Sequence, residues 1–159
     1  MEKTNVMRIL DKAKMSYTAH TYDAGDGAID GVSVAAKMGQ DSAQVFKTLV
    51  TQGADKNYYV FVIPVCAELN LKKAAKAAGV KSVAMIPVAE INRVTGYIRG
   101  GCSPIGMKKQ YATVFDESAA AQSSIIVSGG KIGFQIEMPP AALIAFVRGK
   151  TADIADAAM

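Results

Sequence analysis

Two apolar runs of similar length, residues 45–51 and 58–65, stand on either side of the polar segment 52–57. Runs of this length are typical of buried strands, and a short polar connection joins such strands as a hairpin. Elsewhere the expected strands and helices mix irregularly, with hairpins beside crossovers. This order favours a mixed sheet or a partly closed barrel with peripheral helices over a doubly wound fold. The predicted fold class is α/β or α+β.

Periodicity and end signals predict the remaining elements. Helices are expected over residues 4–14, 30–38, 71–78, 87–96 and 139–147, and further strands over residues 16–22, 81–86, 111–115, 124–127 and 132–137. The segment 97–110 contains several glycines and no regular period, so it is predicted to be a loop. The chain has 159 residues and no internal repeat or linker, and we expect one domain over residues 1–159.

The composition limits the classes of partner and cofactor. A formal net charge of +4 is compatible with a polyanionic partner, and equally with an ordinary soluble protein rich in lysine. Two cysteines and one histidine without short metal-type spacing argue against a metal site. The first residues predict an amphipathic helix rather than a secretory signal, and the longest apolar stretch is too short for a membrane span. We therefore expect the protein to reside in a reducing cytoplasm.

Lys47 is unusual because it lies inside an apolar strand, between Phe46 and Thr48. If Phe46 and Thr48 face one side of that strand, Lys47 faces the other. A charged amine facing inward is costly unless it is paired or used. The alternative is an edge-strand lysine that prevents aggregation. The pattern leaves both interpretations open.

The segment from Gly100 to Gly106 is the second candidate. Tight glycine turns can direct successive backbone amides into one concavity, which suits an oxyanion or a phosphate. Its spacing fits neither a Walker loop nor a dinucleotide-binding turn. Without further support it is a structural loop.

Other motifs are weak when taken singly. The segment 128–131 predicts a hairpin turn, and the lysines of segment 69–76 form a basic helical stripe that is either a solvated face or a phosphate contact. His20 lies in a predicted strand and is interpreted as structural. Cys102 lies in the glycine-containing loop, but nothing in the sequence supplies an activating base. No nucleophile–base pair is evident.

Taken together, these motifs are specific. Tyr22-Asp23, Phe46-Lys47-Thr48-Leu49, and the segments 69–76, 100–106 and 128–131 occur in one order over nearly the whole chain. In this combination the sequence resembles the YbaK/EbsC family of cysteinyl-tRNA(Pro) deacylases, which is related to the editing domain of bacterial prolyl-tRNA synthetases. The resemblance implies a mixed, barrel-like sheet surrounded by helices. It also implies hydrolysis, in trans, of the ester that joins a wrong amino acid to the 3′ end of tRNA.

The resemblance further implies partners and residue roles. The partners are aminoacylated tRNA and prolyl-tRNA synthetase, with no cofactor, metal, membrane or DNA. Lys47 matches the essential lysine that holds the aminoacyl group and its carbonyl, and Gly101 lies in the loop whose backbone approaches that carbonyl. The implied substrate-binding residues are Tyr22, Phe46, Thr48, Asn70, Gly100, Ser103, Pro104, Gly106, Ser128 and Gly129. The lysines predicted to contact tRNA are Lys72, Lys73, Lys76, Lys108, Lys109 and Lys131.

The implied mechanism is substrate-assisted, because the thiol of the bound cysteine attacks its own ester carbonyl and the protein only positions it. Cys102 departs from the family pattern, which has an aliphatic or small polar residue at this position. Its thiol either only packs against its neighbours or acts as a nucleophile that other family members lack. Three other functions stay open. They are a non-catalytic tRNA- or synthetase-binding module, an editing enzyme for alanine or another small amino acid, and a small-ligand binder without an RNA role.

Overall fold

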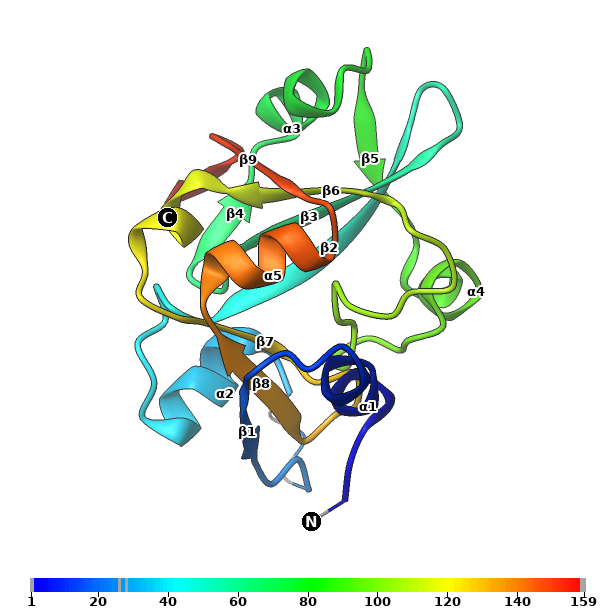
Figure 1. The fold of residues 1–159 in the computed structure, drawn as a ribbon. Helices are drawn as coiled ribbons and strands as arrows, with labels where there is room; N and C mark the ends of the chain where they lie inside the picture. Colours follow the sequence, from blue (N-terminus) through cyan, green and yellow to red (C-terminus); the bar gives the residue numbers. More distant parts are fainter. Residues whose placement is uncertain (1, 26, 28, 158–159) are drawn as a thin grey trace.

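The computed structural model describes residues 2–25, 27 and 29–157 (Figure 1). Its largest sheet has the strand order β5-β2-β3-β6-β9. These strands are β2 (Phe46–Gly53), β3 (Tyr58–Pro64), β5 (Val83–Met85), β6 (Ala112–Asp116) and β9 (Lys150–Ala152). β2 pairs antiparallel with both β3 and β5, whereas β6 pairs parallel with β3 and with β9. The predicted hairpin is confirmed, and the sheet is mixed.

A second, antiparallel sheet has the order β1-β8-β7, formed by β1 (Thr18–Thr21), β7 (Ile125–Ser128) and β8 (Phe134–Met138). A parallel bridge between Val45 and Ile126 joins it to the beginning of β2. The short strands β4 (Ala67–Leu69) and β10 (Ala155–Ala157) form a third pair. No pairing among the described strands closes the sheets into a barrel. The predicted mixed α+β class is confirmed.

Capping residues mark the beginnings of three helices, and glycines mark the ends of two of them. In α1 (Asn5–Lys12), α2 (Gly31–Met38) and α3 (Leu71–Ala78), the side chains of Thr4, Asp30 and Asn70 accept a hydrogen bond from the first turn. Gly39 and Gly79 end α2 and α3 in the left-handed conformation, with φ of 65° and 75°. The predicted helix 87–96 is a 3-10 turn (Val88–Glu90) followed by α4 (Ile91–Thr95), and α5 is Pro140–Phe146.

β3 is buried on both faces, which explains its unbroken apolar sequence. Val60 and Val62 pack into the main core with α1, α5 and the second sheet. Phe61 and Ile63 face the opposite side, where α3 covers the large sheet (Figure 1). Within the described ranges, no helix is both long enough and apolar enough to cross a membrane.

Candidate functional site

Two connected cavities lie where the beginning of β2 meets α2 and the loop that precedes β6. The inner cavity has a volume of about 120 Å³, and the outer groove has a volume of about 840 Å³. Because the same residues line both, they form one site with a narrow and a wide part. The shared wall consists of Ile29, Gly31, Lys47, Thr48, Val65, Gly100 and Cys102.

β2 presents an unpaired backbone edge to this site. On the β3 side, Val65 N donates to Val45 O at 2.8 Å and Gly53 N donates to Asn57 O at 2.8 Å. Main-chain groups of an antiparallel strand point alternately to its two neighbours. The N–H and C=O of Thr48 therefore point away from β3, toward the edge where β5 pairs with Thr51–Gly53 and Ile86 N donates to Val50 O at 3.2 Å. Within the described part of the chain, these two groups therefore have no partner strand.

The side chain of Thr48 is also unsatisfied. Among the described residues, its Oγ1 is the one buried side-chain oxygen or nitrogen without a hydrogen-bond partner. An unpaired buried hydroxyl costs about 1–3 kcal/mol, so this group calls for a functional explanation. Phe46, on the same face of β2, is buried in the main core and forms part of the inner cavity's wall.

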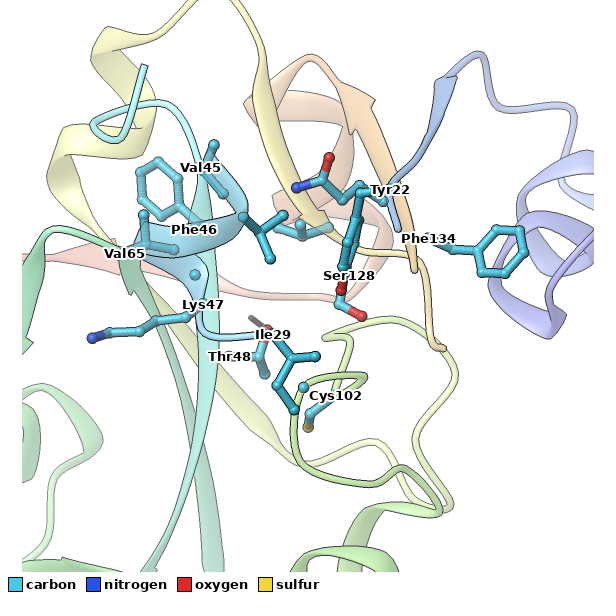
Figure 2. A pocket seen from close by; sticks show the side chains of 15 residues that line it. Tyr22, Ile29, Val45, Phe46, Lys47, Thr48, Val65, Cys102, Ser128 and Phe134 are labelled. Carbon is cyan, nitrogen blue, oxygen red and sulfur yellow. The ribbon is translucent and has the colours of Figure 1, made fainter. Parts of the chain in front are cut away.

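Lys47 lies on the opposite face of β2 from Phe46 and Thr48, as the alternation of the strand requires. It is half-buried and lines both parts of the site. Within the described part of the chain, its ammonium has no carboxylate or other hydrogen-bond partner. Figure 2 shows its side chain extending away from Ser128 and Cys102. The ammonium therefore does not lie between the other polar residues of the inner cavity.

Tyr22 and Ser128 supply hydroxyl groups on another side of the inner cavity (Figure 2). Tyr22 follows β1 and is fixed by its backbone N–H, which donates to Gly133 O at 2.9 Å. Ser128 ends β7, and its Oγ accepts from Gly130 N at 3.1 Å. The inner cavity thus combines apolar walls with a few polar groups, as small-ligand sites do.

The glycine-containing loop is held against the turn that follows β7. A Cβ atom on Gly101 would lie 3.1 Å from Ile132 N and 3.2 Å from Lys131 Cα, so a larger residue would push the two backbone segments apart by a few tenths of an ångström. The hydroxyl of Tyr97 supports the loop from within, because it donates a hydrogen bond to Ile105 O. Packing at Gly101 therefore positions the neighbouring Gly100 and Cys102, which line both parts of the site.

His20 belongs to a separate network that fixes the beginning of β2. Its Nε2 lies 2.8 Å from Glu137 Oε1, and Gln44 donates to both Ser124 Oγ at 2.8 Å and Glu137 Oε2 at 3.2 Å. Hydrogen bonds from Ser124 and His20 lower the pKa of Glu137. Since Gln44 precedes Val45, this network ties β2 to the second sheet at the inner cavity.

Known proteins resemble this chain in sequence and in fold. A family model described as "Aminoacyl-tRNA editing domain" matches residues 29–146. The chain belongs to this family. It is 45% identical over 153 residues to the Enterococcus faecalis protein named "Putative Cys-tRNA(Pro)/Cys-tRNA(Cys) deacylase EbsC", covering 96% of this chain and 93% of that protein.

Two further proteins resemble this editing domain more distantly. It is 26% identical over 126 residues to a "Proline--tRNA ligase" from Methylobacillus flagellatus, covering 72% of this chain and 22% of the ligase. A crystal structure described as "a putative trans-editing enzyme for prolyl tRNA synthetase" superposes with a TM-score of 0.84 at 21% identity. That match covers 98% of this chain and 99% of the other. It shows that the two chains share a fold.

The structure brings together about half of the predicted substrate-binding set. Tyr22, Phe46, Lys47, Thr48, Gly100 and Ser128 line the inner cavity of this editing domain. Six other predicted residues line neither part of the site, namely Asn70, Gly101, Ser103, Pro104, Gly106 and Gly129. They have local structural contacts instead. Asn70 caps α3 and donates to Asp156 at 2.9 Å, and Gly129 N donates to Phe134 O at 2.9 Å.

Several wall residues of this editing domain were not predicted. A Cβ atom on Gly31 would lie 2.3 Å from Val65 Cγ1, so glycine is required where α2 meets the end of β3. Arg99 lines the outer groove together with exposed apolar residues of β5 and of the 3-10 turn. Only the folded arrangement brings these residues to the site. The cap at Asp30 is the one local signal that places Gly31 at the beginning of a helix.

The Cys102 thiol is a poor nucleophile in this environment. Burial raises its pKa to about 11, against the smaller opposing effect of a hydrogen bond with Thr95. The thiol is therefore protonated at neutral pH, whereas the thiolate is the reactive form.

We expect the Cys102→Ser variant to deacylate within about twofold of the unaltered protein, because a protonated thiol contributes packing rather than chemistry. The rate of amino acid release measures this. A more than tenfold loss in a variant with unchanged thermal unfolding would instead assign the thiol a chemical role.

Proposed function

We propose that this protein is a trans-editing deacylase that hydrolyses the ester of mischarged Cys-tRNA(Pro). Membership of the aminoacyl-tRNA editing domain family and the 45% identity to the Enterococcus faecalis protein support the class of reaction. The observation that carries the proposal is the joining of a small cavity to a large groove along the unpaired edge of β2. A charged tRNA end has the same two parts, a small acyl group esterified to a much larger nucleoside.

The inner cavity is assigned to the amino acid and the outer groove to the terminal nucleoside. Cysteine and proline have similar volumes, so a synthetase pocket separates them poorly and a second hydrolytic site is required. At about 120 Å³, the inner cavity admits only a small side chain. The ester then lies where the two parts meet, beside Lys47, Thr48 and Gly100.

Positioning is the main contribution of the protein in this proposal. The Thr48 hydroxyl supplies an unpaired polar group at the junction, the main-chain N–H of Thr48 faces the edge without a partner strand, and Lys47 supplies a cation from the groove side. Donors fixed at the place where negative charge develops stabilise the transition state. Holding the reacting groups in contact contributes several kcal/mol more.

The nucleophile is the thiol of the substrate. The thiol loses its proton to the solvent, its sulfur bonds to the ester carbonyl carbon, the ester C–O bond breaks, and the 3′-terminal ribose oxygen leaves and takes up a proton from water. Water then opens the cyclic thioester and releases cysteine. This scheme needs no nucleophile from the protein, and it is consistent with the high pKa of Cys102.

The proposal is tested by incubating the purified protein with Cys-tRNA(Pro) and measuring released cysteine. Release that depends on the protein supports it. Binding of charged tRNA without release would instead favour a non-catalytic binding module. Aminoacylated tRNA is the proposed partner, prolyl-tRNA synthetase is the proposed source of the substrate, and the cytoplasm is the proposed compartment.

We expect Thr48→Val to lower kcat/KM for Cys-tRNA(Pro) by about tenfold, since a bond to the substrate worth about 1–2 kcal/mol is lost. Its free energy of unfolding should stay the same or rise, because an unsatisfied buried hydroxyl is removed.

Thr51→Val on the same strand is the matched control. Thr51 Oγ1 donates to Tyr59 O at 2.9 Å, away from the site, so this change should lower stability and leave kcat/KM intact. A Thr48→Val variant with full activity would remove the hydroxyl from the proposed contacts.

A further inference from the structure

A third concave surface lies beside α3 and β5, at the end of the molecule remote from α1 (Figure 1). We call it the α3 groove. It has a volume of about 290 Å³ and three lysines in its wall, Lys72 and Lys76 from α3 and Lys81 from the segment before β5. Lys72 and Lys76 are four residues apart and so share one face of the helix. The groove therefore concentrates positive charge around a hollow.

The lysines of the α3 groove are not neutralised by the protein. Among the described residues, Lys72, Lys76 and Lys81 have no carboxylate partner, and all three are exposed. The adjacent Lys73 is different, because its Nζ lies 3.0 Å from Asp153 and 3.5 Å from Asp156.

Two of the other three lysines predicted to contact tRNA are also engaged. The Nζ of Lys131 lies 2.7 Å from Glu2, and that of Lys108 donates to Arg93 O at 3.2 Å. The structure thus separates lysines that stabilise the fold from those available to an external anion.

The α3 groove adjoins the outer groove through β5. Val83 lines the α3 groove, whereas Met85 and Ile86 line the outer groove. A strand rises about 3.3 Å per residue, so Val83 and Met85 are about 7 Å apart along β5. β5 is an edge strand of the large sheet, and its residues Ala84 and Met85 are exposed. A chain leaving the outer groove therefore reaches the lysines by crossing one short strand.

We propose that the α3 groove binds backbone phosphates of the tRNA acceptor end. This inference rests on the proposed function, because it continues the path of the substrate. With the acyl group in the inner cavity and the terminal nucleoside in the outer groove, the preceding nucleotides must leave along the surface. Phosphates on that path meet Lys72, Lys76 and Lys81, which are free to contact them. Such contacts strengthen binding through charge neutralisation and release of counterions.

The test compares two triple variants on two substrates. The groove variant is Lys72→Gln, Lys76→Gln and Lys81→Gln. The control variant is Lys12→Gln, Lys14→Gln and Lys150→Gln, which removes the same charge from exposed lysines of α1, its C-terminal end and β9. The substrates are Cys-tRNA(Pro) and 2′(3′)-O-cysteinyladenosine, which has the ester and the terminal nucleoside but no phosphate.

For the groove variant, we expect KM for Cys-tRNA(Pro) to rise about tenfold or more, because three phosphate contacts are lost. The slope of log(kcat/KM) against log salt should become shallower by about 2–3. Hydrolysis of cysteinyladenosine should not change in either variant, and the control variant should keep the tRNA parameters of the unaltered protein.

The outcomes separate the two proposals. If the unaltered protein cleaves both substrates and the groove variant does so equally well with the same salt slope, the α3 groove has no role and the deacylase proposal stands. An equal loss in the control variant also overturns the inference, because the effect is then one of total charge. If the unaltered protein cleaves neither substrate, the deacylase proposal fails. Fluorescence anisotropy with uncharged tRNA(Pro) then tests whether the α3 groove binds tRNA. Weaker binding by the groove variant alone supports the inference, and equal binding by all three proteins overturns it.

Discussion

Replacing Lys47 by alanine is expected to slow deacylation of Cys-tRNA(Pro) by at least about 100-fold, the usual cost of removing a donor that stabilises developing charge. Lys47 lines both parts of the site, and within the described chain its ammonium has no partner that would otherwise account for it. Because its side chain extends away from Ser128 and Cys102, we expect it to meet the ester from the groove side (Figure 2). Single-turnover release of cysteine measures the effect.

The same change should leave the fold intact. A half-buried lysine without an ion pair contributes little to stability, so the free energy of unfolding should change by less than about 1 kcal/mol. Lys150→Ala on β9, at the opposite edge of the same sheet, is the matched control and should keep full activity. A folded Lys47→Ala variant that still deacylates at the original rate would refute the role given to this residue.

The protein should cleave Cys-tRNA(Pro) at least about 100-fold faster than Ser-tRNA(Pro) or Ala-tRNA(Pro), because only cysteine brings its own strong nucleophile into position. The pH dependence gives an independent check. Below the ordinary thiol pKa of about 8.5, the thiolate fraction and the rate should rise about tenfold per pH unit and then level off. The pKa of Cys102 is about 11, so a plateau near 8.5 belongs to the substrate.

Rates on the three substrates should be measured for the unaltered protein and for the Cys102→Ser variant. The preference for cysteine should be the same in both. Equal rates on cysteinyl and alanyl substrates would eliminate thiol assistance and favour water as the nucleophile, with a broader role in editing small amino acids. A preference that disappears only in the Cys102→Ser variant would transfer the chemistry to the protein.

Local signals predicted most of the fold. The hairpin of β2 and β3 follows from two apolar runs and a polar connection, and α3 begins after Asn70 and ends before Gly79 as predicted. The three-residue strands β4, β9 and β10 were missed. They are too short to show a period, and they exist because residues distant in sequence pair with them, such as Ala155 with Leu69.

From the residues alone only Lys47 and the glycine-containing loop could be singled out, whereas Tyr22, Thr48 and Ser128 were predicted from the family resemblance. Lys47 and Thr48 are polar within an apolar strand, and both line the site. Asn70 and Ser103 belong to recognisable motifs but have local roles, since Asn70 caps a helix and Ser103 Oγ accepts from Ile105 N at 3.3 Å. The contact between Gly31 and Val65 has no local signature, because it depends on where α2 packs.

β5 pairs only with the second half of β2, so among the described strands the first half of β2 has no partner on that side. This arrangement has a consequence for self-association. Exposed backbone donors and acceptors at a sheet edge normally invite a strand from another molecule. Here α2 on one side and Gly100 and Cys102 on the other enclose that edge in a recess. Adjacent strands lie about 4.8 Å apart along a whole row of hydrogen bonds, and α2, Gly100 and Cys102 stand beside this row. We therefore expect this edge to accept a short acyl group more readily than a strand of another molecule.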